Sequence, residues 1–274
     1  MGERTNFVRA MWATLAALCL LSVSCTSPQR RIPETLPRES FLFVMQDVVF
    51  RACPKGVECK EPGDYQNIGP VNPATGVPAE MGISMVGSGF ITATDGVSSW
   101  GITAGHLCAE PPHPLTTSEG AHIKGSSKIQ VNMWGGASYE AKIIQILPLI
   151  DMCVLEIRAP LKPARLASSA PRPGERVYTL AAPFGSYSST MIPTFEGFYS
   201  GILGTGLRTQ AVYTIPARPG SSGSAIFNSR GHVVGMTSMA LVNFENMCLS
   251  PPFEAVHAVI QATIEHANAS RRKR

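Results

Sequence analysis

Three short segments of the sequence place a histidine, an aspartate and a serine beside runs of apolar residues. His106 ends the run WGITAGH, Asp151 precedes the run MCVLEI, and Ser222 lies in the glycine-containing stretch PGSSGSA. A serine nucleophile needs a base to accept its proton, a group to orient that base, and donors for the oxyanion. The three side chains are therefore candidates for the nucleophile, base and orienting group of an acyl-transfer reaction.

Each of these segments alone also has an ordinary structural explanation. A Gly/Ser stretch is commonly a loop, and an aspartate before an apolar run is commonly a turn residue at the entry to a strand. The order His, Asp, Ser favours a joint site, because each residue lies at the edge of a predicted strand. The G-x-S-x-G elbow of α/β-hydrolases does not fit, since Ser224 stands where its second glycine belongs.

The elements that must position these residues are predicted to be mostly strands. Short apolar runs separated by Gly and Pro recur from Met81: GISMVGSGFITA, SSWGITA, KIQVNMW, YEAKIIQIL and MCVLEI. After a Pro-rich break at 159–174 they resume with ERVYTLAAP, TMIPTFEGFYSGIL, TQAVYTIPA, SAIFN and HVVGMTSMALV. This pattern predicts an all-β fold of two units. FLFVMQDVVF (Phe41–Phe50) is one more predicted strand, and apolar spacing of three and four in PFEAVHAVIQATIEHA predicts a C-terminal helix.

Composition allows an ordinary folded core and gives no sign of nucleic-acid binding. The chain has 274 residues, of which 44% are hydrophobic, and a formal net charge of +4. The last four residues, RRKR, are all positive, so the rest of the chain is near neutral. We expect this run to be a solvated tail, with an anchor for anionic surfaces as the alternative.

The first 25 residues have the pattern of a secretory signal. Arg4 and Arg9 precede an uncharged run at 10–23, which is shorter than the roughly 20 apolar residues that span a bilayer. Its end, SVSC, resembles a bacterial lipoprotein signal with Cys25 as the lipidated residue, although Ser22 replaces the usual leucine. Plain cleavage and an uncleaved anchor are the alternatives. We expect an exported protein, secreted or held in the cell envelope by a lipid on Cys25.

The three segments together resemble the chymotrypsin-fold (trypsin-like) serine proteases, in the style of bacterial glutamyl-endopeptidase-like and HtrA-like members. TAGHLC resembles the family's TAAHC, DMCVL resembles DIAL, and GSSGSA resembles GDSGGP. GSGF, RVYTLAAPFG and VVGMTSMA also resemble family segments, so that the likeness covers about residues 81–268. The separation of 45 positions from His106 to Asp151 is typical of the family. The resemblance implies two six-stranded antiparallel β-barrels.

The expected organisation follows from these patterns. It comprises a signal at 1–25, a tether and N-terminal arm at 26–80, a first barrel with His106 and Asp151 at 81–165, and a second barrel with Ser222, helix and basic tail at 166–274.

The resemblance implies a role for each residue. Ser222 is the nucleophile, His106 the general base and then acid, and Asp151 the group that orients the imidazole. The backbone N–H groups of Gly220 and Ser222 form the oxyanion hole. Ser221 stands where relatives activated by cleavage carry an aspartate that captures the new N-terminus, so we expect no such activation.

Side-chain preference is predicted from five positions around the nucleophile. Pro216 and Ala217 match the base of the specificity pocket and carry no acid, which disfavours Arg or Lys at the cleaved position. Ser238, Met239 and Ala240 match the strand that pairs with the substrate backbone. We expect a preference for small or hydrophobic side chains.

An exported chain can form disulfides. With Cys19 and Cys25 in the signal, five cysteines are left, so at least one is unpaired. Cys53 and Cys59 flank PKGVE and form a predicted local pair. Cys108 and Cys153 each lie two residues past a candidate catalytic residue, and alternation along the strand points Cys153 toward the His106 segment. We hypothesise a bridge between them; the alternative is that Cys153 is a small core residue.

The function predicted from the sequence is that of an exported serine endopeptidase acting on protein or peptide substrates through an acyl-enzyme. We expect a monomer that needs no cofactor or metal and binds no nucleic acid. Three alternatives are weighed beside it: a catalytically inactive protease-like binding module, an esterase-type acyl hydrolase with the same triad, and a surface lipoprotein with an adhesive role.

Overall fold

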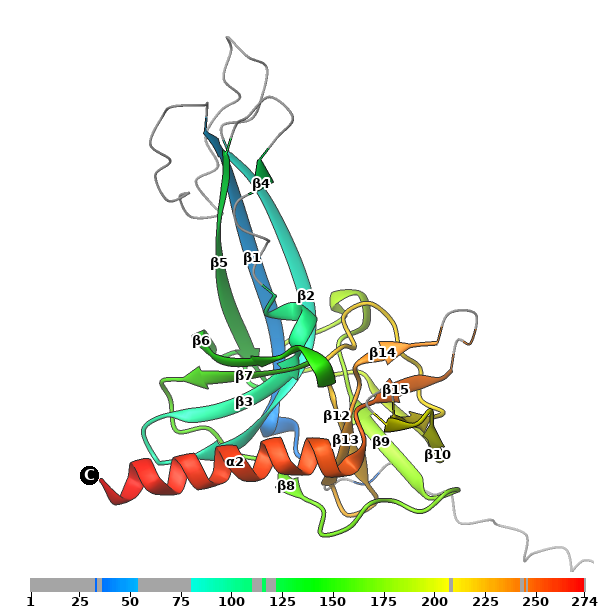
Figure 1. Ribbon diagram of the computed structural model, residues 1–274. Helices are drawn as coiled ribbons and strands as arrows, with labels where there is room; N and C mark the ends of the chain where they lie inside the picture. The colour runs from blue at the N-terminus through cyan, green and yellow to red at the C-terminus, as the bar shows by residue number, and fades with distance from the viewer. Residues whose placement is uncertain are drawn as a thin grey trace, which may run out of the picture. The chain divides into compact units, whose positions relative to one another are not determined.

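Strands make up most of the fold, and one long helix follows them (Figure 1). The computed structural model describes residues 36–53, 80–109, 122–206, 209–241 and 246–273, together with Pro33, Leu115, Thr116 and Phe244. The strands form two sheets, which confirms the predicted all-β fold. The helix, α2 (Phe253–Arg272), confirms the predicted C-terminal helix and includes the first two residues of the basic run.

The first sheet closes into an antiparallel barrel. Its strands are β1 (Phe41–Cys53), β2 (Glu80–Thr94), β3 (Ser99–Ala104), β4 (Leu115–Thr116), β5 (His122–Met133), β6 (Ser138–Leu147) and β7 (Met152–Ile157). The order is β1-β2-β3-β7-β6-β5-β4, and an additional pairing of β1 with β5 closes six of them. From the sequence, this barrel was expected to begin at residue 81, with Phe41–Phe50 in an N-terminal arm. That boundary is corrected, because β1 pairs along both of its edges and belongs to the barrel.

Alternation along β1 explains why it is central to the fold. Leu42 and Val44, both fully buried, point into the core of the barrel. Phe41 and Phe43 point the other way and pack against the second sheet. A strand buried on both faces reads as a continuous apolar run.

The second sheet has eight short strands. They are β8 (Arg165–Leu166), β9 (Arg176–Leu180), β10 (Thr194–Leu203), β11 (Gln210–Tyr213), β12 (Ala225–Asn228), β13 (His232–Met236), β14 (Met239–Ala240) and β15 (Cys248–Ser250). Their order is β14-β15-β11-β10-β9-β12-β13-β8. Only Thr237 and Ser238 separate β13, which pairs with β12, from β14, which pairs with β15, so the sheet curls back on itself. Six strands were predicted for this sheet. The structure has two more, because β8 adds a parallel strand beside β13 and because a break separates β14 from β13.

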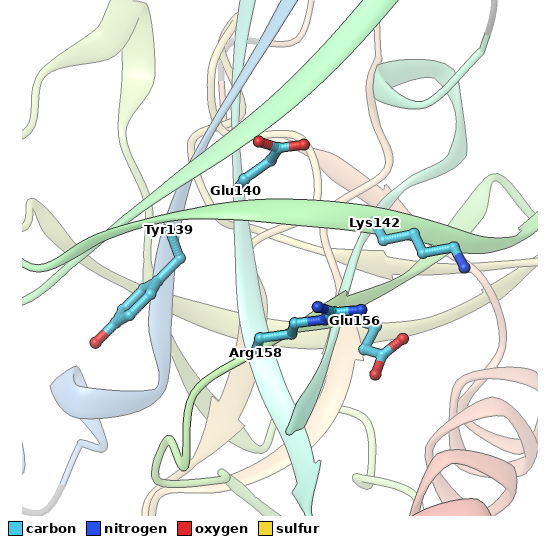
Figure 2. A pocket seen from close by; sticks show the side chains of 5 residues that line it. All are labelled: Tyr139, Glu140, Lys142, Glu156 and Arg158. Atoms are coloured by element: carbon cyan, nitrogen blue, oxygen red, sulfur yellow. The ribbon is translucent and has the colours of Figure 1, made fainter. Parts of the chain in front are cut away.

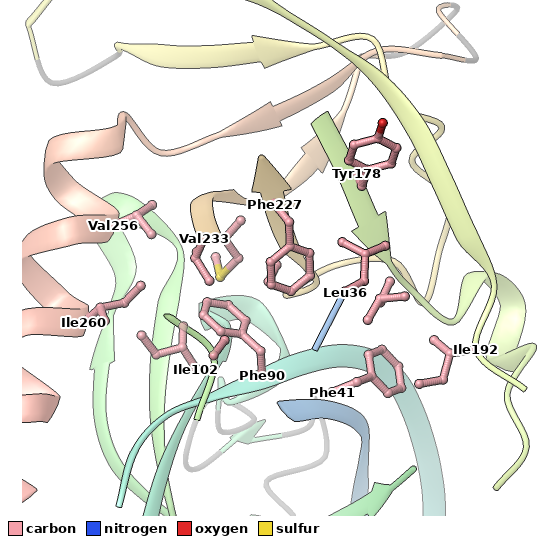
Figure 3. Packing of buried hydrophobic residues seen from close by; sticks show 14 of the residues in the cluster. Leu36, Phe41, Phe90, Ile102, Tyr178, Ile192, Phe227, Val233, Val256 and Ile260 are labelled. Carbon is pink, nitrogen blue, oxygen red and sulfur yellow. The ribbon is translucent and has the colours of Figure 1, made fainter. Parts of the chain in front are cut away.

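One apolar cluster joins the two sheets and the helix (Figure 3). Phe41, Phe90 and Ile102 enter it from the first barrel, and Tyr178 and Phe227 enter it from the second sheet. Burying an aromatic side chain of this kind contributes roughly 1.5–3 kcal/mol to stability. The cluster therefore fixes the two sheets against each other, which a site built from both of them requires.

Helix α2 packs on this cluster through Val256 and Ile260, one turn apart and each 1% exposed. Its last turn is also held: the guanidinium group of Arg271 donates to the backbone oxygen atoms of Thr94 (3.0 Å) and Asp95 (3.4 Å). The basic run predicted to be solvated thus begins with a residue bound to the first barrel.

Three strands of the first barrel continue beyond it as an extension (Figure 1). β1 lies in the middle, with Asp47 opposite both Ser84 of β2 and Lys128 of β5, and this double pairing continues to Arg51. We call this part the strand extension: residues 47–53 of β1, 80–84 of β2 and 122–128 of β5.

Candidate active site

His106 and Asp151 are brought together by two neighbouring strands of the first barrel. β3 is buried at all six positions and pairs with β7, with Ala104 opposite Met152. The chain turns after Ala104 into a 3-10 turn, η3 (Gly105–Leu107), which contains His106. Asp151 directly precedes β7 and has a left-handed backbone (φ 49°), which aspartate tolerates better than most residues. The register therefore places the two candidate residues side by side.

The carboxylate of Asp151 receives hydrogen bonds from three groups. Nδ1 of His106 lies 3.0 Å from both carboxylate oxygens, and the backbone N–H of His106 donates to Oδ1 at 2.8 Å. The hydroxyl of Ser238 donates to Oδ2. Burial alone would raise the pKa of Asp151, but the hydrogen bonds from His106 and Ser238 and the attraction to the imidazole outweigh it and lower this pKa. The carboxylate is thus ionised at neutral pH and accepts a hydrogen bond from the N–H group at Nδ1, which leaves Nε2 as the basic nitrogen.

The turn that carries Ser222 requires glycine at two positions. Gly220 (φ +93°) and Gly223 (φ +87°) both have left-handed backbones. A Cβ atom at Gly220 would lie 2.3 Å from the carbonyl oxygen of Ala182, and one at Gly223 would lie 2.1 Å from that of Ser88. Neither contact is sterically allowed, so the turn packs at a distance that only glycine permits.

Ser88 fixes the same turn from the first barrel. Its backbone N–H donates to the carbonyl oxygen of Ser222 at 2.8 Å, and its hydroxyl donates to that of Gly220 at 2.8 Å. The Ser88 hydroxyl also accepts from the N–H of Ala182 at 3.0 Å. These bonds hold the carbonyl groups of Gly220 and Ser222, and because the peptide bond is planar they also fix the N–H groups of Ser221 and Gly223.

Two N–H groups of the turn are available to a ligand. Those of Ser221 and Gly223 donate to the carbonyl oxygens of Arg218 (2.8 Å) and Thr237 (2.6 Å). Within the described residues, no acceptor pairs with the N–H groups of Gly220 and Ser222. Unpaired donors beside a candidate nucleophile are the arrangement that stabilises an oxyanion.

A cavity of about 450 Å³ contains the candidate nucleophile and base. Its lining consists of Met85, Val86, His106, Leu107, Phe184, Pro219, Gly220 and Ser222. The hydroxyl of Ser222 donates to the carbonyl oxygen of Ser238 at 3.4 Å and not to His106. Hydrogen bonds between catalytic groups are often formed only when substrate binds.

The five residues predicted to set the side-chain preference lie elsewhere. Ala217 is buried in the core of the second sheet, and Pro216 precedes it in the same segment. Ser238 binds Asp151, and Met239 and Ala240 form the exposed strand β14. None of the five lines the 450 Å³ cavity, which therefore lies on the side of Ser222 next to the first barrel.

The apolar residues that line this cavity were not predicted from the sequence. Phe184 is 71% exposed, has a left-handed backbone (φ 51°), and donates its N–H to the carbonyl oxygen of Pro219 at 2.6 Å. A large apolar side chain between Pro183 and Gly185, in a turn, was the available signal. Met85 and Val86 carried none, because they read as ordinary strand residues.

A disulfide between Cys108 and Cys153 lies directly behind the pair His106–Asp151. Both residues are fully buried, with Cα atoms 6.3 Å apart, so the bridge hypothesised from the sequence is present in the structure. Cys248 is free and buried, and burial raises its pKa to about 12. Cys53 is the last residue of β1, whereas its predicted partner Cys59 and the lipidation position Cys25 fall outside the described residues, so neither prediction is tested.

A second cavity, of about 480 Å³, lies on the first barrel. It is lined by Tyr139, Glu140, Lys142, Glu156 and Arg158, and Figure 2 shows these side chains on β6 and around the end of β7. Lys142 and Glu156 are opposite each other in the ladder. It shares no residue with the cavity around Ser222, and its side chains of mixed charge are typical of a solvated sheet face.

Comparison with known proteins identifies the family of this arrangement. The sequence profile described as "Trypsin-like peptidase domain" matches residues 87–236, which is more than half of the chain. The "Serine protease Do-like HtrA" of Lactobacillus helveticus is 28% identical over 162 residues, covering 54% of this chain and 39% of that protein. The "Serine protease HTRA2, mitochondrial" of Bos taurus is 27% identical over 218 residues, covering 77% and 41%. The chain thus spans about two fifths of the length of these curated relatives.

A solved structure supports the fold. The "HtrA-type protease AlgW with decapeptide" superposes with a TM-score of 0.55 at 19% identity, covering 82% of this chain and 65% of that one. At this identity the likeness concerns the arrangement of the strands. It agrees with the chymotrypsin-like fold that the sequence analysis expected.

Proposed function

The chain belongs to the trypsin-like peptidase family, and from this premise we propose that it is a serine endopeptidase that uses Ser222, His106 and Asp151. The observation that carries the proposal is the Asp151 carboxylate, which holds Nδ1 of His106 and so directs its other nitrogen toward the cavity that Ser222 shares. Two unpaired N–H groups beside Ser222 support it.

In the first half of the proposed reaction, Oγ of Ser222 attacks the carbonyl carbon of the substrate and gives its proton to Nε2 of His106. The new C–O bond places a negative charge on the former carbonyl oxygen, and the N–H groups of Gly220 and Ser222 donate to it. The C–N bond then breaks, and His106 returns the proton to the leaving amine. Asp151 stabilises the imidazolium throughout and stays ionised.

In the second half, water replaces the amine. His106 removes a proton from water as the water attacks the acyl group on Ser222, and the carboxylic acid leaves as the serine regains its proton. Each oxyanion donor is worth about 3–4 kcal/mol where such donors have been removed in other enzymes.

We also propose that the enzyme is active without capturing a new N-terminus produced by cleavage. Ser221 has no acidic group, is 2% exposed, and is held by local bonds between its N–H and hydroxyl and the backbone of Arg218. Hydrogen bonds from Ser88 hold the neighbouring carbonyl groups. The turn thus has internal supports that do not depend on an ion pair with an α-amino group.

The experiment that tests the proposal is labelling of Ser222 with a fluorophosphonate probe. We expect labelling at Ser222, its loss in Ser222→Ala and His106→Ala, and cleavage of unfolded casein by the wild type only. Labelling without cleavage of any peptide would favour the esterase, and neither labelling nor cleavage would favour the inactive binding module.

Export is a separate part of the proposal and rests on residues 1–25 alone. None of the helices in the part of the chain that the structure describes is long and apolar enough to cross a membrane. We propose that the signal is removed and that Cys25 carries the lipid. Intact-mass measurement of the mature protein tests this, because diacylglycerol on an N-terminal Cys25 and plain cleavage give different masses.

A further inference from the structure

A small closed ring of the chain joins His106 to Asp151 by hydrogen bonds at one end and by a covalent bond at the other. The backbone N–H and Nδ1 of His106 lie 2.8 and 3.0 Å from Oδ1 of Asp151. Two positions further along each segment, the Cys108–Cys153 disulfide joins the end of the η3 turn to β7. The covalent bond and the hydrogen bonds therefore hold the same two segments together.

The hydrogen-bonded end of the ring is partly open to water. The side chain of His106 is 48% exposed and that of Asp151 is 23% exposed. Water competes for such hydrogen bonds, so each contributes little unless the two groups are already held at the bonding distance. The turn that contains His106 therefore has to be fixed by other contacts.

The backbone of β7, with the residue before it, fixes the turn on the side that precedes His106. Thr103 and Ala104 pair with β7, and the N–H of Gly105 donates to the carbonyl oxygen of Asp151 at 2.9 Å. The approach is close, since a Cβ atom on Gly105 would lie 3.0 Å from the carbonyl carbon of Asp151. The chain thus enters the turn at a fixed position relative to the carboxylate.

The disulfide fixes the turn on the side that follows His106. Among the described residues, the backbone pairing with β7 and Asp151 ends at Gly105. Three residues later, the bond from Cys108 to Cys153 ties the chain to the second residue of β7. His106 therefore lies between a backbone anchor and a covalent anchor that both belong to the Asp151 segment.

Two weaker contacts also act on the second side of the turn. The side chain of Leu107 is 4% exposed and lies against Gly87. The amide of Gln46 donates to the carbonyl oxygen of Ala109 at 3.4 Å, which is long for a hydrogen bond. These contacts can keep the turn folded, but neither limits its distance from β7 as a covalent bond does.

We propose that Cys108 and Cys153 are positioning residues, and that formation of their bond switches the proposed peptidase on. The bond holds His106 against Asp151, so that Nε2 is presented to Ser222. With two free thiols the turn moves relative to the carboxylate, and a displacement of about 1 Å costs roughly 10²-fold in rate. This inference rests on the proposed endopeptidase function.

Burial makes the switch act once. Both cysteines are fully buried among apolar side chains of the first barrel, which include Leu42, Val44 and Leu155. A dissolved thiol reaches a disulfide in such a place only when the barrel opens. The bond is therefore made while the chain folds, and it stays in the folded protein.

Formation of the bond needs a disulfide oxidant, such as oxidised glutathione or the disulfide of an oxidoreductase. One cysteine thiolate attacks a sulfur atom of the oxidant, which forms a mixed disulfide and releases one thiol. The second thiolate displaces the other thiol, so that two electrons and two protons pass from Cys108 and Cys153 to the oxidant. The cytosol keeps thiols reduced, whereas compartments reached by export are oxidising. With export as proposed, the enzyme is inactive until it has left the cytosol.

The first test compares the oxidised wild type with wild type that is unfolded in urea with dithiothreitol and refolded with the reductant present. We expect kcat to fall by roughly 10²-fold with little change in KM, and to recover after refolding with oxidised glutathione. Dithiothreitol added to the folded, oxidised protein should leave kcat unchanged. Cys248→Ala and Cys53→Ala/Cys59→Ala are the controls, and both should respond as the wild type does.

Proton NMR reports on the position of His106 directly. A proton between Nδ1 and a carboxylate gives a downfield resonance, which we expect in the oxidised protein and expect to be broadened or lost in the reduced protein. A reduced, folded protein with the kcat of the oxidised form would overturn the inference. A loss of kcat with an unchanged resonance would overturn it as well, because the bond would then not act through His106 and Asp151.

The second test separates positioning from stability. Cys108→Ala/Cys153→Ala should show the lowered kcat of the reduced wild type, measured where circular dichroism shows it to be folded. Ile157→Ala is the matched control: Ile157 is fully buried in the same core at the far end of β7, about 20 Å from Asp151 at roughly 3.3 Å per residue. It should lose stability through its cavity and keep the wild-type kcat. Equal losses of kcat in both variants would mean that only stability matters.

A second variant, Cys108→Ala/Cys153→Val, fills the core without a crosslink and should also have a low kcat. Wild-type kcat in this variant would show that packing, and not the bond, positions the turn. If no form without the bond folds, the bond acts on the fold and the inference fails. If the oxidised wild type is neither labelled at Ser222 nor cleaves peptides, the proposed function itself fails. If the oxidised and reduced forms are equally active, only this inference is lost.

Discussion

The hydroxyl of Ser238 donates a hydrogen bond to Oδ2 of Asp151, although 87 residues separate them and they belong to different sheets. The carbonyl group of the same serine accepts from the hydroxyl of Ser222. Ser238 therefore contacts both outer members of the proposed triad, and it lies in the two-residue break between β13 and β14.

Ser238→Ala should weaken the hold on the Asp151 carboxylate without removing it, since two donors of His106 remain. A lost hydrogen bond to a charged group costs about 1.5–3 kcal/mol in stability. We expect a loss in this range in urea unfolding and a decrease of kcat/KM of roughly tenfold or less. Ser238→Thr keeps the hydroxyl and is the control; equal losses in both variants would show that packing, and not the hydrogen bond, matters.

Asp151→Asn should abolish most of the activity while leaving the fold in place. The amide can present its NH₂ group to Nδ1, which favours the tautomer with the proton on Nε2 and removes the base. In another enzyme with this triad, the same change lowered kcat by about 10⁴-fold. We expect a loss of this order in peptide hydrolysis, with an unchanged circular dichroism spectrum. Activity within tenfold of the wild type would exclude Asp151 as the orienting group.

The same variant gives a prediction for stability against pH. Burial alone would raise the pKa of Asp151, yet the hydrogen bonds from His106 and Ser238 lower it below the ordinary value of 3.8. The folded state therefore favours the ionised carboxylate more than the unfolded state does. This stabilisation is complete above pH 3.8 and is lost as the pH falls through the lower pKa of the folded state.

Urea unfolding of wild type and Asp151→Asn between pH 5 and pH 3 measures this contribution. We expect the difference between their free energies of unfolding to be constant near pH 5 and to shrink toward pH 3. A difference that grows as the pH falls would mean that the carboxylate has a raised pKa.

The candidate residues of the site could be selected from the sequence because each is in a short segment with a distinct pattern. His106 follows an apolar strand, Asp151 precedes one, and Ser222 lies between two glycines that a tight turn requires. Periodicity also located most of the strands and the helix, since these elements bury one face. The order His106, Asp151, Ser222 along the chain supported the assignment of the three residues to one site.

What the sequence did not indicate depends on register and on contacts between sheets. The pairing of β1 with both β2 and β5 is long-range, so Phe41–Phe50 read as an isolated strand. Ser88 is in the first barrel and donates hydrogen bonds to the turn that contains Ser222. No pattern in the sequence around Ser88 indicates this contact. The cavity residues Met85 and Val86 became visible only when β2 was placed beside Ser222.

Removing the disulfide should destabilise the protein and the site together. Cys108 and Cys153 are 45 residues apart and each lies two residues past His106 or Asp151. In the chain-entropy model, a closed loop of this length is worth about 4 kcal/mol, and measured values are commonly 2–4 kcal/mol. We expect the double variant Cys108→Ala/Cys153→Ala to lose stability in this range in urea.

A control for this prediction is the buried thiol. Cys248→Ala removes a free cysteine of the second sheet. A reductant should therefore lower the urea stability of this variant as much as it lowers that of the wild type. Because burial raises the pKa of Cys248 to about 12, its thiol should also resist alkylation at pH 8 in the folded protein. Alkylation of Cys248 at the rate of a free peptide thiol would contradict the burial seen here.

Gly220→Ala is expected to remove activity through a clash and not through backbone strain alone. Gly220 and Gly96 have nearly the same backbone, φ +93° and +94°. A Cβ atom on Gly220 would lie 2.3 Å from the carbonyl oxygen of Ala182, whereas one on Gly96 has no neighbour within 4 Å. Both substitutions carry the cost of a left-handed alanine, about 1–2 kcal/mol, but only Gly220→Ala must move the turn that holds the two unpaired N–H groups.

Measurement of kcat and of urea stability in the two variants separates these effects. Gly96→Ala should lose about 1–2 kcal/mol of stability and keep the wild-type kcat. Gly220→Ala should lose more stability, and its kcat should fall by roughly 10²–10³-fold, the effect of losing one oxyanion donor. If Gly220→Ala keeps its activity, the turn can shift without displacing the donors, and the N–H of Gly220 is not part of the oxyanion hole. If Gly96→Ala loses activity as well, left-handed strain and not the contact with Ala182 explains both variants.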